Sequence, residues 1–256
     1  SWIRWATMSS AGRDPQLPIV NWHHTDPSVY GSPASVVRYG MWVGVSRNHA
    51  ERLSRHFQLP VKHIYHGIDT QFYRPSGLPR GNRWLWLSRW TVEKGGADVI
   101  SLAKRMKVGV DMYGDTVIIG NTSYKDYCFR EADGLFARAY PGVSRDAAVE
   151  LYSTSKGYLY WLNWEEPLGL SVLEAMATGC VPIVSRRGAI PEIIRDGVTG
   201  FLVDSVKDME QLIERDAIRD INPEVMRKHV EENFSLEQFV NNWEELLTRV
   251  AQGERW

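Results

Sequence analysis

Cysteine is scarce in this chain, and so is any excess of charge. The 256 residues include two cysteines, Cys128 and Cys180, each in an apolar stretch. Two such residues exclude a disulfide-rich scaffold and a cysteine-based zinc site, and their surroundings indicate a reducing compartment. Lysine and arginine number 30 and aspartate and glutamate 31, which leaves a formal net charge of −1. This balance argues against nucleic acid as a partner.

Long hydrophobic runs are also missing. No apolar run approaches the ~18 residues of a membrane span. The first residues, SWIRWATMSS, lack the apolar core of a signal peptide. We therefore expect a cytoplasmic protein without a transmembrane span. The glycine-containing run VGVDMYG (108–114) lies within a strand pattern and does not open a helix, which argues against a nicotinamide-dependent enzyme.

Short runs rich in β-branched and aromatic residues alternate with helical patterns. The expected strands are residues 17–22, 41–46, 61–67, 83–88, 108–114, 157–162, 180–185 and 200–203. Helices are expected directly after the capping residues Ser46, Ser144, Asn222 and Ser235. Most of the strands are continuously apolar, as strands covered on both faces are. The order predicts an α/β protein with doubly wound, Rossmann-type parallel sheets.

A linker is expected at residues 73–83, YRPSGLPRGNR, where prolines, glycines and arginines interrupt the apolar pattern. We predict a small or incomplete α/β domain over residues 1–75 and a Rossmann-like domain over residues 76–234. A final helix lies within residues 235–256. Its apolar stripe consists of Phe239, Trp243, Leu246 and Leu247.

The segment NWEEPLGLSVLEAMATG (163–179) reads as a loop at the end of a strand, followed by a helix. In open α/β sheets, ligands bind at the carboxyl ends of the strands. The backbone N–H groups of Gly169 and Leu170 would precede a helix N-terminus, which favours a phosphate. Pro167 fixes the direction of the chain, and Gly169 permits close approach of a ligand to the backbone.

The two glutamates of this segment have simpler explanations that stay open at this point. Ser171 and Glu174 fit a capping box, in which Ser171 is the N-cap of the helix. Gly179 would end the same helix. Glu166 fits a solvated loop carboxylate equally well.

A second loop, SRWTVEKGG (88–96), follows another expected strand and carries Arg89 and Lys94. A cation at a helix start opposes the helix dipole, so Lys94 does not serve helix stability and is expected to face a negative group. Arg89 can bind two phosphate oxygens at once. Two solvated charges near Glu93 are the alternative. Together the two loops predict one anion site.

Residues 166–203, EPLGLSVLEAMATG through DGVTGFLV, resemble the signature of the retaining glycosyltransferases of family 4, which have the two-domain GT-B fold. The shared pattern is a glutamate, seven residues, a second glutamate and a small-residue helix. SRWTVEKG is similar to the family's Arg-x4-Lys-Gly diphosphate clamp. IYHGIDTQFYRP (64–75) resembles the end of its first domain, and PIVNWHHT (18–25) resembles a strand of that domain that ends in histidine and threonine.

The resemblance implies a role for each motif residue. Glu166 would lie against the donor sugar and Glu174 would bind the ribose hydroxyls. Arg89 and Lys94 would hold the diphosphate, and His24, rather than His23, would face the transferred sugar. The loop N–H groups at Gly169 and Leu170, beside Pro167, would help to hold the donor.

The implied reaction is transfer of a sugar from a nucleoside diphosphate sugar, such as a UDP- or GDP-sugar, to an acceptor hydroxyl with retention. The acceptor would be a glycan, a lipid or a small molecule, and no cofactor is implied. The chain has no Asp-x-Asp motif, so a metal-clamped diphosphate is not expected. His63 and His66 are interpreted as structural, since no third ligand is evident.

Two features separate this sequence from the family pattern. Nothing before Leu17 supplies the usual first strand and glycine-rich loop, so we expect a shortened first domain. The last helix would cross back onto that domain, with part of its stripe left exposed or covered by a dimer or a partner chain. Two alternatives stay open: a sugar-nucleotide-binding module or split subunit that needs a partner, and a glycosidase with paired glutamates.

Overall fold

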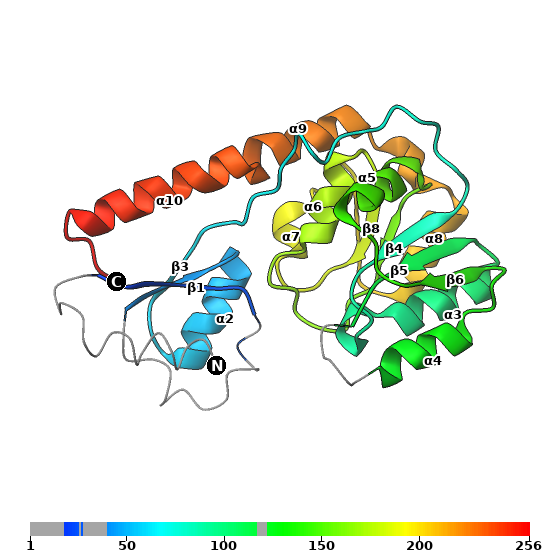
Figure 1. The fold of residues 1–256 in the computed structure, drawn as a ribbon, viewed down its shortest axis with the longest axis horizontal. Coiled ribbons are helices and arrows are strands. Elements are labelled where there is room, and N and C mark those ends of the chain that lie inside the picture. Colours follow the sequence, from blue (N-terminus) through cyan, green and yellow to red (C-terminus); the bar gives the residue numbers. More distant parts are fainter. Residues whose placement is uncertain (1–17, 26, 28–39, 117–121) are drawn as a thin grey trace.

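The computed structural model describes residues 18–25, 27, 40–116 and 122–256. Two lobes are visible in Figure 1. The small lobe holds a three-stranded sheet, and the large lobe holds a six-stranded sheet with helices on both faces. Every strand pair is parallel. The predicted α/β class is therefore confirmed.

The sheet of the small lobe has the order β1 (Val20–His23), β2 (Met41–Gly44), β3 (Val61–His63). Helix α2 (Arg47–Phe57) follows β2 and begins where the Ser46 hydroxyl accepts a hydrogen bond from the His49 N–H at 3.1 Å. The expected strand 61–67 ends earlier, at His63. Its remaining residues form part of the connection to the large lobe.

The sheet of the large lobe has the order β6-β5-β4-β7-β8-β9. This order reverses direction between β4 and β7, and at such a switch point the loops diverge and leave a crevice. The strands are β4 (Trp84–Leu87), β5 (Val110–Tyr113), β6 (Ala137–Tyr140), β7 (Tyr158–Tyr160), β8 (Pro182–Ser185) and β9 (Phe201–Val203). β6 is absent from the predicted strands, because Arg138 in its middle is exposed and only Ala137 of this edge strand is buried.

Helices cover this sheet. They are η3 (Val92–Lys94), α3 (Gly96–Met106), α4 (Ser123–Glu131), α5 (Arg145–Thr154), α6 (Leu170–Ala177), α7 (Ile190–Ile193), α8 (Val206–Glu214), η4 (Ala217–Asp220) and α9 (Pro223–Phe234). The last helix of the chain is α10 (Leu236–Ala251). The predicted caps Ser144, Asn222 and Ser235 each accept a backbone N–H of their helix. Trp84, Trp86 and Trp90 are at most 1% exposed and fill the core between sheet and helices.

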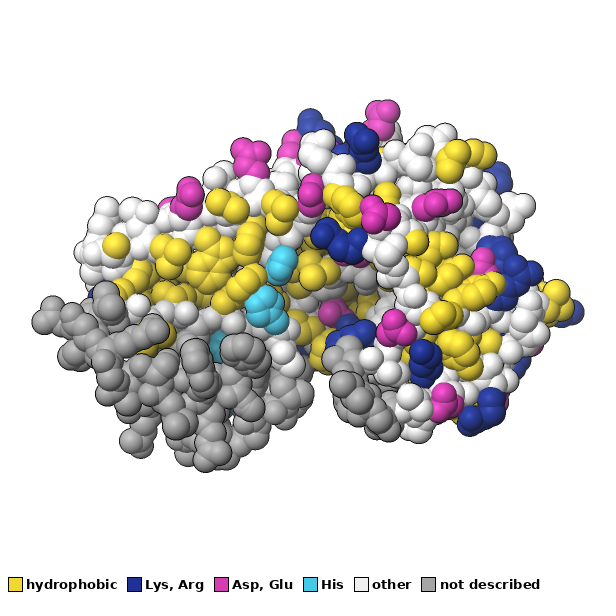
Figure 2. Space-filling view, in the orientation of Figure 1, with side chains coloured by type: hydrophobic (Ala, Val, Ile, Leu, Met, Phe, Trp, Pro, Cys, Tyr) yellow, Lys and Arg dark blue, Asp and Glu magenta, His cyan; other side chains and the backbone are white. Residues whose placement is uncertain are grey.

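Helix α10 leaves the large lobe and runs along the small sheet (Figure 1). Leu246 is buried with Val43 and Ile64 of the small lobe, and Phe239 and Trp243 pack beside them. Leu247 was expected in the same stripe but is 48% exposed, because it projects from a different side of the helix. An apolar surface lies below α10 on the small lobe (Figure 2). No helix among the described residues is long and apolar enough to span a membrane.

The two lobes meet at the N-terminus of α2. The Glu192 carboxylate of α7 accepts the backbone N–H groups of Arg47 at 3.0 Å and Asn48 at 2.7 Å. It also accepts the Tyr65 hydroxyl at 2.6 Å. These bonds supply partners for the free N–H groups of a helix start and place a negative charge at its positive end. The Ser46 hydroxyl donates to the Pro167 carbonyl at 2.6 Å.

Replacing Glu192 with alanine is expected to lower the free energy of unfolding by about 2 kcal/mol, because three hydrogen bonds to one carboxylate are lost and helix donors are left unpaired. Glu237→Ala is the matched control, since Glu237 is an exposed glutamate in the first turn of α10. Thermal and denaturant unfolding of both variants would measure the difference. Equal stability of the two variants would contradict a role for Glu192 in joining the lobes.

Candidate active site

A cavity of about 560 Å³ lies where the large sheet reverses direction. It also reaches the small lobe, through Val45 and His66. Figure 2 shows the hollow between the lobes, with charged side chains inside it. The eight predicted site residues all line this cavity: His24, Arg89, Lys94, Glu166, Pro167, Gly169, Leu170 and Glu174.

The loop after β4 brings Arg89 and Lys94 to the cavity. Lys94 ends the short helix η3, and Gly95 follows with φ +63°. A side chain on Gly95 would overlap the Trp161 carbonyl, so glycine is required there for both space and conformation. The indole N–H of the buried Trp86 donates to the Lys94 carbonyl at 3.1 Å. The backbone that carries the lysine is therefore fixed by the core.

Lys94 is buried, and its ammonium lies 2.5 Å from Oε2 of Glu166, which follows β7. Only 7% of the Lys94 side chain and 9% of the Glu166 side chain are exposed. Burial lowers the pKa of Lys94, and the Glu166 carboxylate opposes this shift by stabilising the charged amine. Both solvated-charge explanations are therefore wrong for this pair. The structure places the Glu166 carboxylate opposite Lys94, as a negative group of the kind that the sequence predicted.

Arg89 differs from Lys94 in its surroundings. Its side chain is exposed at the cavity wall, and no carboxylate of the described residues lies within ion-pair distance of it. Arg89 also contributes to the lowered pKa of Lys94, since it is a nearby positive charge. An unpaired guanidinium beside a buried ammonium provides an attractive position for an anion.

The N-terminus of α6 faces the same cavity. Gly169 is its N-cap, with φ +100°, and a side chain there would come within 2.8 Å of Ile190 Cδ1. Leu170 is the first helical residue, so the prediction that Ser171 caps the helix is wrong. The N-cap is Gly169, two residues before Ser171, because glycine adopts the left-handed conformation there. The N–H groups of Gly169 and Leu170 donate to no acceptor in the described chain, and Ser171 Oγ accepts from Tyr158 at 3.0 Å.

Glu174 lies one turn further along α6 and does not form a capping box. Its Oε2 accepts the Tyr152 hydroxyl at 3.2 Å, and the Tyr73 hydroxyl also hydrogen-bonds to the carboxylate. Burial raises the pKa of Glu174, and the two tyrosine hydroxyls and nearby Arg145 oppose the shift. A half-buried carboxylate with polar neighbours at a cavity wall suits a ligand with hydroxyl groups.

The structure distinguishes the two adjacent histidines. His24 lines the cavity, whereas His23 is 6% exposed and stacks on Trp42 with ring centroids 3.9 Å apart. Burial lowers the pKa of His23 to about 4. His66 also lines the cavity, with its ring centroid 6.1 Å from that of His24. Among the described residues, no three His, Cys, Asp or Glu side chains are grouped as metal ligands.

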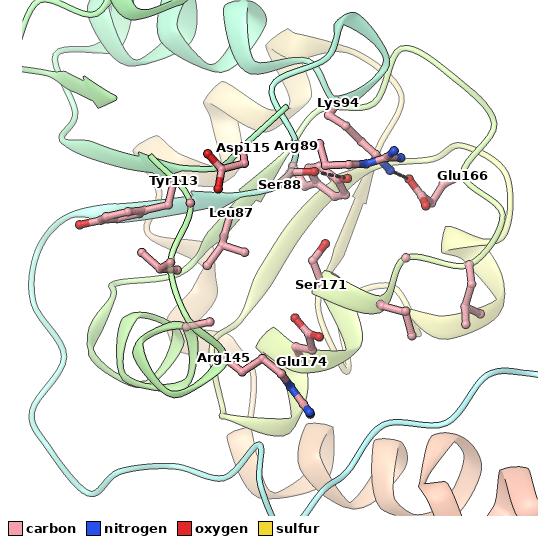
Figure 3. A pocket seen from close by; sticks show the side chains of 18 of the residues that line it. Leu87, Ser88, Arg89, Lys94, Tyr113, Asp115, Arg145, Glu166, Ser171 and Glu174 are labelled. Atoms are coloured by element: carbon pink, nitrogen blue, oxygen red, sulfur yellow. Dashed lines mark hydrogen bonds and ion pairs between the residues drawn. The ribbon is translucent and has the colours of Figure 1, made fainter. Parts of the chain in front are cut away.

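The neighbouring Glu165 and Glu166 are also distinguished. Glu165 turns to the Gly188 N–H, at 2.6 Å, and does not line the cavity. Glu166 does line it, as the spacing to Glu174 predicts. Figure 3 shows Arg89, Lys94 and Glu166 together at one end of the cavity, with Glu174 and Arg145 at the other end and Ser171 between them. The polar groups therefore line an elongated site.

Sequence reasoning missed several residues that complete the site. Tyr73, Tyr152 and Arg145 are neighbours of the Glu174 carboxylate. Trp164 donates a hydrogen bond to Glu166, and the Tyr160 ring lies beside the Lys94 ammonium. Tyr73 belongs to the predicted linker, and the tyrosines of β7 and α5 read as core residues. No spacing rule connects them to Glu166 or Glu174, since their contacts depend on how strands and helices pack.

The two-lobed fold with a cavity at the switch point is the GT-B fold of glycosyltransferases. Anabaena Alr3699/HepE, solved in complex with UDP-glucose, superposes with a TM-score of 0.82 at 16% identity, over 96% of this chain and 76% of that one. Sucrose-phosphate synthase (tll1590) from Thermosynechococcus elongatus superposes with a TM-score of 0.78 at 16% identity, over 99% of this chain and 72% of that one.

Residues 76–233 match the model of the family "Glycosyl transferases group 1". The match covers more than half of the chain, and the chain belongs to this family. N-acetyl-alpha-D-glucosaminyl L-malate synthase of Bacillus anthracis is 33% identical over 117 residues, 43% of this chain and 30% of that protein. Alpha-maltose-1-phosphate synthase of Mycobacterium tuberculosis (strain H37Rv) is 29% identical over 160 residues, 55% of this chain and 41% of that protein. The matches thus span less than half of these curated relatives.

Proposed function

We propose that this chain is a retaining, metal-independent glycosyltransferase of family 4 that transfers a sugar from a nucleoside diphosphate sugar to an acceptor hydroxyl. The observation that carries the proposal is the single elongated cavity. It joins an unpaired arginine, a buried lysine and a free helix N-terminus to two separate carboxylates. We further propose a reducing cytoplasmic location, in keeping with two buried free cysteines.

The diphosphate would bind at the basic end. Arg89 can hold two phosphate oxygens, Lys94 supplies a point charge, and the N–H groups of Gly169 and Leu170 add donors at the positive end of α6. Negative charge accumulates on the diphosphate as its bond to the sugar breaks. These groups would stabilise that charge without a metal ion, because they are already in place before the reaction.

The sugar and the ribose would bind on either side of the diphosphate. Glu166 and His24 would contact the transferred sugar, and Glu174 would accept hydrogen bonds from the ribose hydroxyls. In the reaction the C1–O bond to the phosphate breaks and the acceptor oxygen bonds to C1 on the same face. A phosphate oxygen takes the proton of the acceptor hydroxyl. No step in this scheme requires a cofactor or a carboxylate nucleophile.

A calorimetric screen of UDP-, GDP- and ADP-sugars tests the proposal, and UDP-glucose comes first because HepE was solved with it. We expect one sugar nucleotide to bind, and Arg89→Ala to weaken that binding by about tenfold or more, the effect of losing a charge-assisted hydrogen bond. Arg138→Ala, a change at an exposed arginine of the edge strand β6, is the control. Absence of binding by every sugar nucleotide in the screen would refute the proposal.

A partner-dependent donor-binding module is the second candidate. It is favoured by the position of Arg89, Lys94 and Glu174, since all three line the cavity from the large lobe. Donor binding would then occur without release of nucleoside diphosphate until a partner chain is added. Measurement of diphosphate release with donor and a panel of sugar, lipid and small-molecule acceptors separates the two candidates. The anomeric configuration of a product, read by NMR, tests retention.

A further inference from the structure

Trp164 contacts both charged residues of the buried pair. Its indole N–H donates to Glu166 Oε2 at 2.9 Å, the same oxygen that pairs with Lys94. The Lys94 ammonium lies 4.5 Å from the centroid of the Trp164 ring. Trp164 itself is half-buried and does not line the cavity. It therefore supports the pair without occupying the place of a ligand.

The two donors leave the Glu166 carboxylate in a defined orientation. Oε2 accepts from Lys94 and Trp164, whereas Oε1 accepts no hydrogen bond from the described residues. Glu166 lines the cavity, next to Lys94 (Figure 3). One oxygen is therefore fixed by the protein, and the other is free to accept a hydrogen bond from a ligand.

A diphosphate in the cavity would compete with Glu166 for Lys94. The ammonium has three N–H groups and would be drawn toward the more highly charged ligand. Without a second donor, the carboxylate would then be free to rotate about its last torsion angle, which has a broad energy minimum. The Trp164 N–H is not shared with the diphosphate, and so it keeps Oε2 in place after Lys94 has moved.

We propose that Trp164 is a positioning residue, which keeps Glu166 aligned with the donor sugar while Lys94 binds the diphosphate. The inference rests on the proposed function. It differs from that function in a measurable way: Trp164 should affect binding of the sugar part of the donor and not binding of the nucleoside diphosphate. A purely structural role would affect both ligands alike.

The test compares the affinity of each variant for UDP-glucose and for UDP, or for the corresponding glucose–nucleotide pair if the screen selects guanosine or adenosine. Trp164→Phe removes the N–H and retains an aromatic ring beside Lys94. We expect it to weaken UDP-glucose binding about tenfold and to change UDP binding less than twofold, since a hydrogen bond to a charged group is lost. In the Glu166→Ala background, Trp164→Phe should change UDP-glucose binding less than twofold, because the acceptor of the indole N–H has already been removed.

Trp161→Phe is the matched control, since it removes an indole N–H in the same loop that donates to Asn163 at 3.1 Å and not to Glu166. The inference is overturned if Trp164→Phe changes the two affinities equally or leaves both unchanged. It is also overturned if Trp161→Phe has the same selective effect. If the unmodified chain binds neither UDP-glucose nor any other sugar nucleotide, the proposed function itself fails and this inference fails with it. Thermal unfolding confirms that each variant is folded.

Discussion

Replacing Lys94 with methionine is expected to destabilise the protein by about 3–5 kcal/mol and to weaken donor binding by about 100-fold. The loss of stability follows from the burial of Glu166, whose carboxylate would lose its ion-pair partner at 9% side-chain exposure. The loss of binding follows from removal of the proposed charge-assisted bond between Lys94 and the diphosphate. Denaturant unfolding and calorimetry measure the two effects separately.

The double variant Lys94→Met, Glu166→Gln separates stability from binding. Both charges are removed, so we expect its stability to return to within about 1 kcal/mol of the original chain, because a buried ion pair contributes little net free energy. Donor binding should stay weak. Lys104→Met is the control, because Lys104 pairs with Glu131 at the surface and its side chain is 41% exposed. We expect this change to lower the free energy of unfolding by less than about 1 kcal/mol. Recovery of donor affinity in the double variant would contradict diphosphate binding by Lys94.

Replacing Glu174 with glutamine is expected to weaken donor binding by about 10- to 100-fold at neutral pH, because the proposed charged acceptor of the ribose hydroxyls becomes a neutral one. The effect should depend on pH. Burial raises the pKa of Glu174 above its ordinary value of 4.5, so the carboxylate gains a proton at a higher pH than an exposed glutamate does. Donor affinity should therefore decline as the pH falls through the raised pKa, and the Glu174→Gln variant should lack this decline.

The free energy of unfolding should change with pH in the direction opposite to donor affinity. At pH values between 4.5, the ordinary pKa of glutamate, and the raised pKa of Glu174, the folded chain binds more protons at Glu174 than the unfolded chain does. The free energy of unfolding therefore decreases as the pH rises through this interval. Glu174→Gln should be more stable than the original chain above the interval and equally stable below it. Unfolding and donor titrations as a function of pH measure both effects.

Two further variants test the assignment of this pH dependence. Tyr152→Phe removes a hydrogen bond that lowers the pKa of Glu174, and it should move the decline in donor affinity to higher pH. Glu150→Gln, a change at an exposed glutamate of α5, should leave the profile unchanged. A profile that stays the same in Glu174→Gln would assign the pH dependence to another group.

Much of the fold could be predicted because its signals are local. Apolar strands and capping residues at Ser46, Ser144 and Asn222 depend on neighbours a few residues away, and these predictions agree with the structure. The predictions were wrong where the local signal was weak or where it fitted two different structures equally well. Ser171 fits a capping box as well as Gly169 fits a left-handed cap, and only the backbone conformation decides between them. β6 was missed because only one residue of this edge strand is buried, so its sequence contains no continuous apolar run.

The sequence by itself determined the parallel α/β class, the two loops of the site and the identity of their charged residues, since these follow from order and spacing along the chain. Only the tertiary structure decided which groups meet. Lys94 and Glu166 are 72 residues apart, and Tyr152 and Glu174 are 22 apart. The first pair meets because β4 lies beside β7 in the sheet. Contacts of this kind depend on strand order and helix packing, which no local pattern of residues specifies.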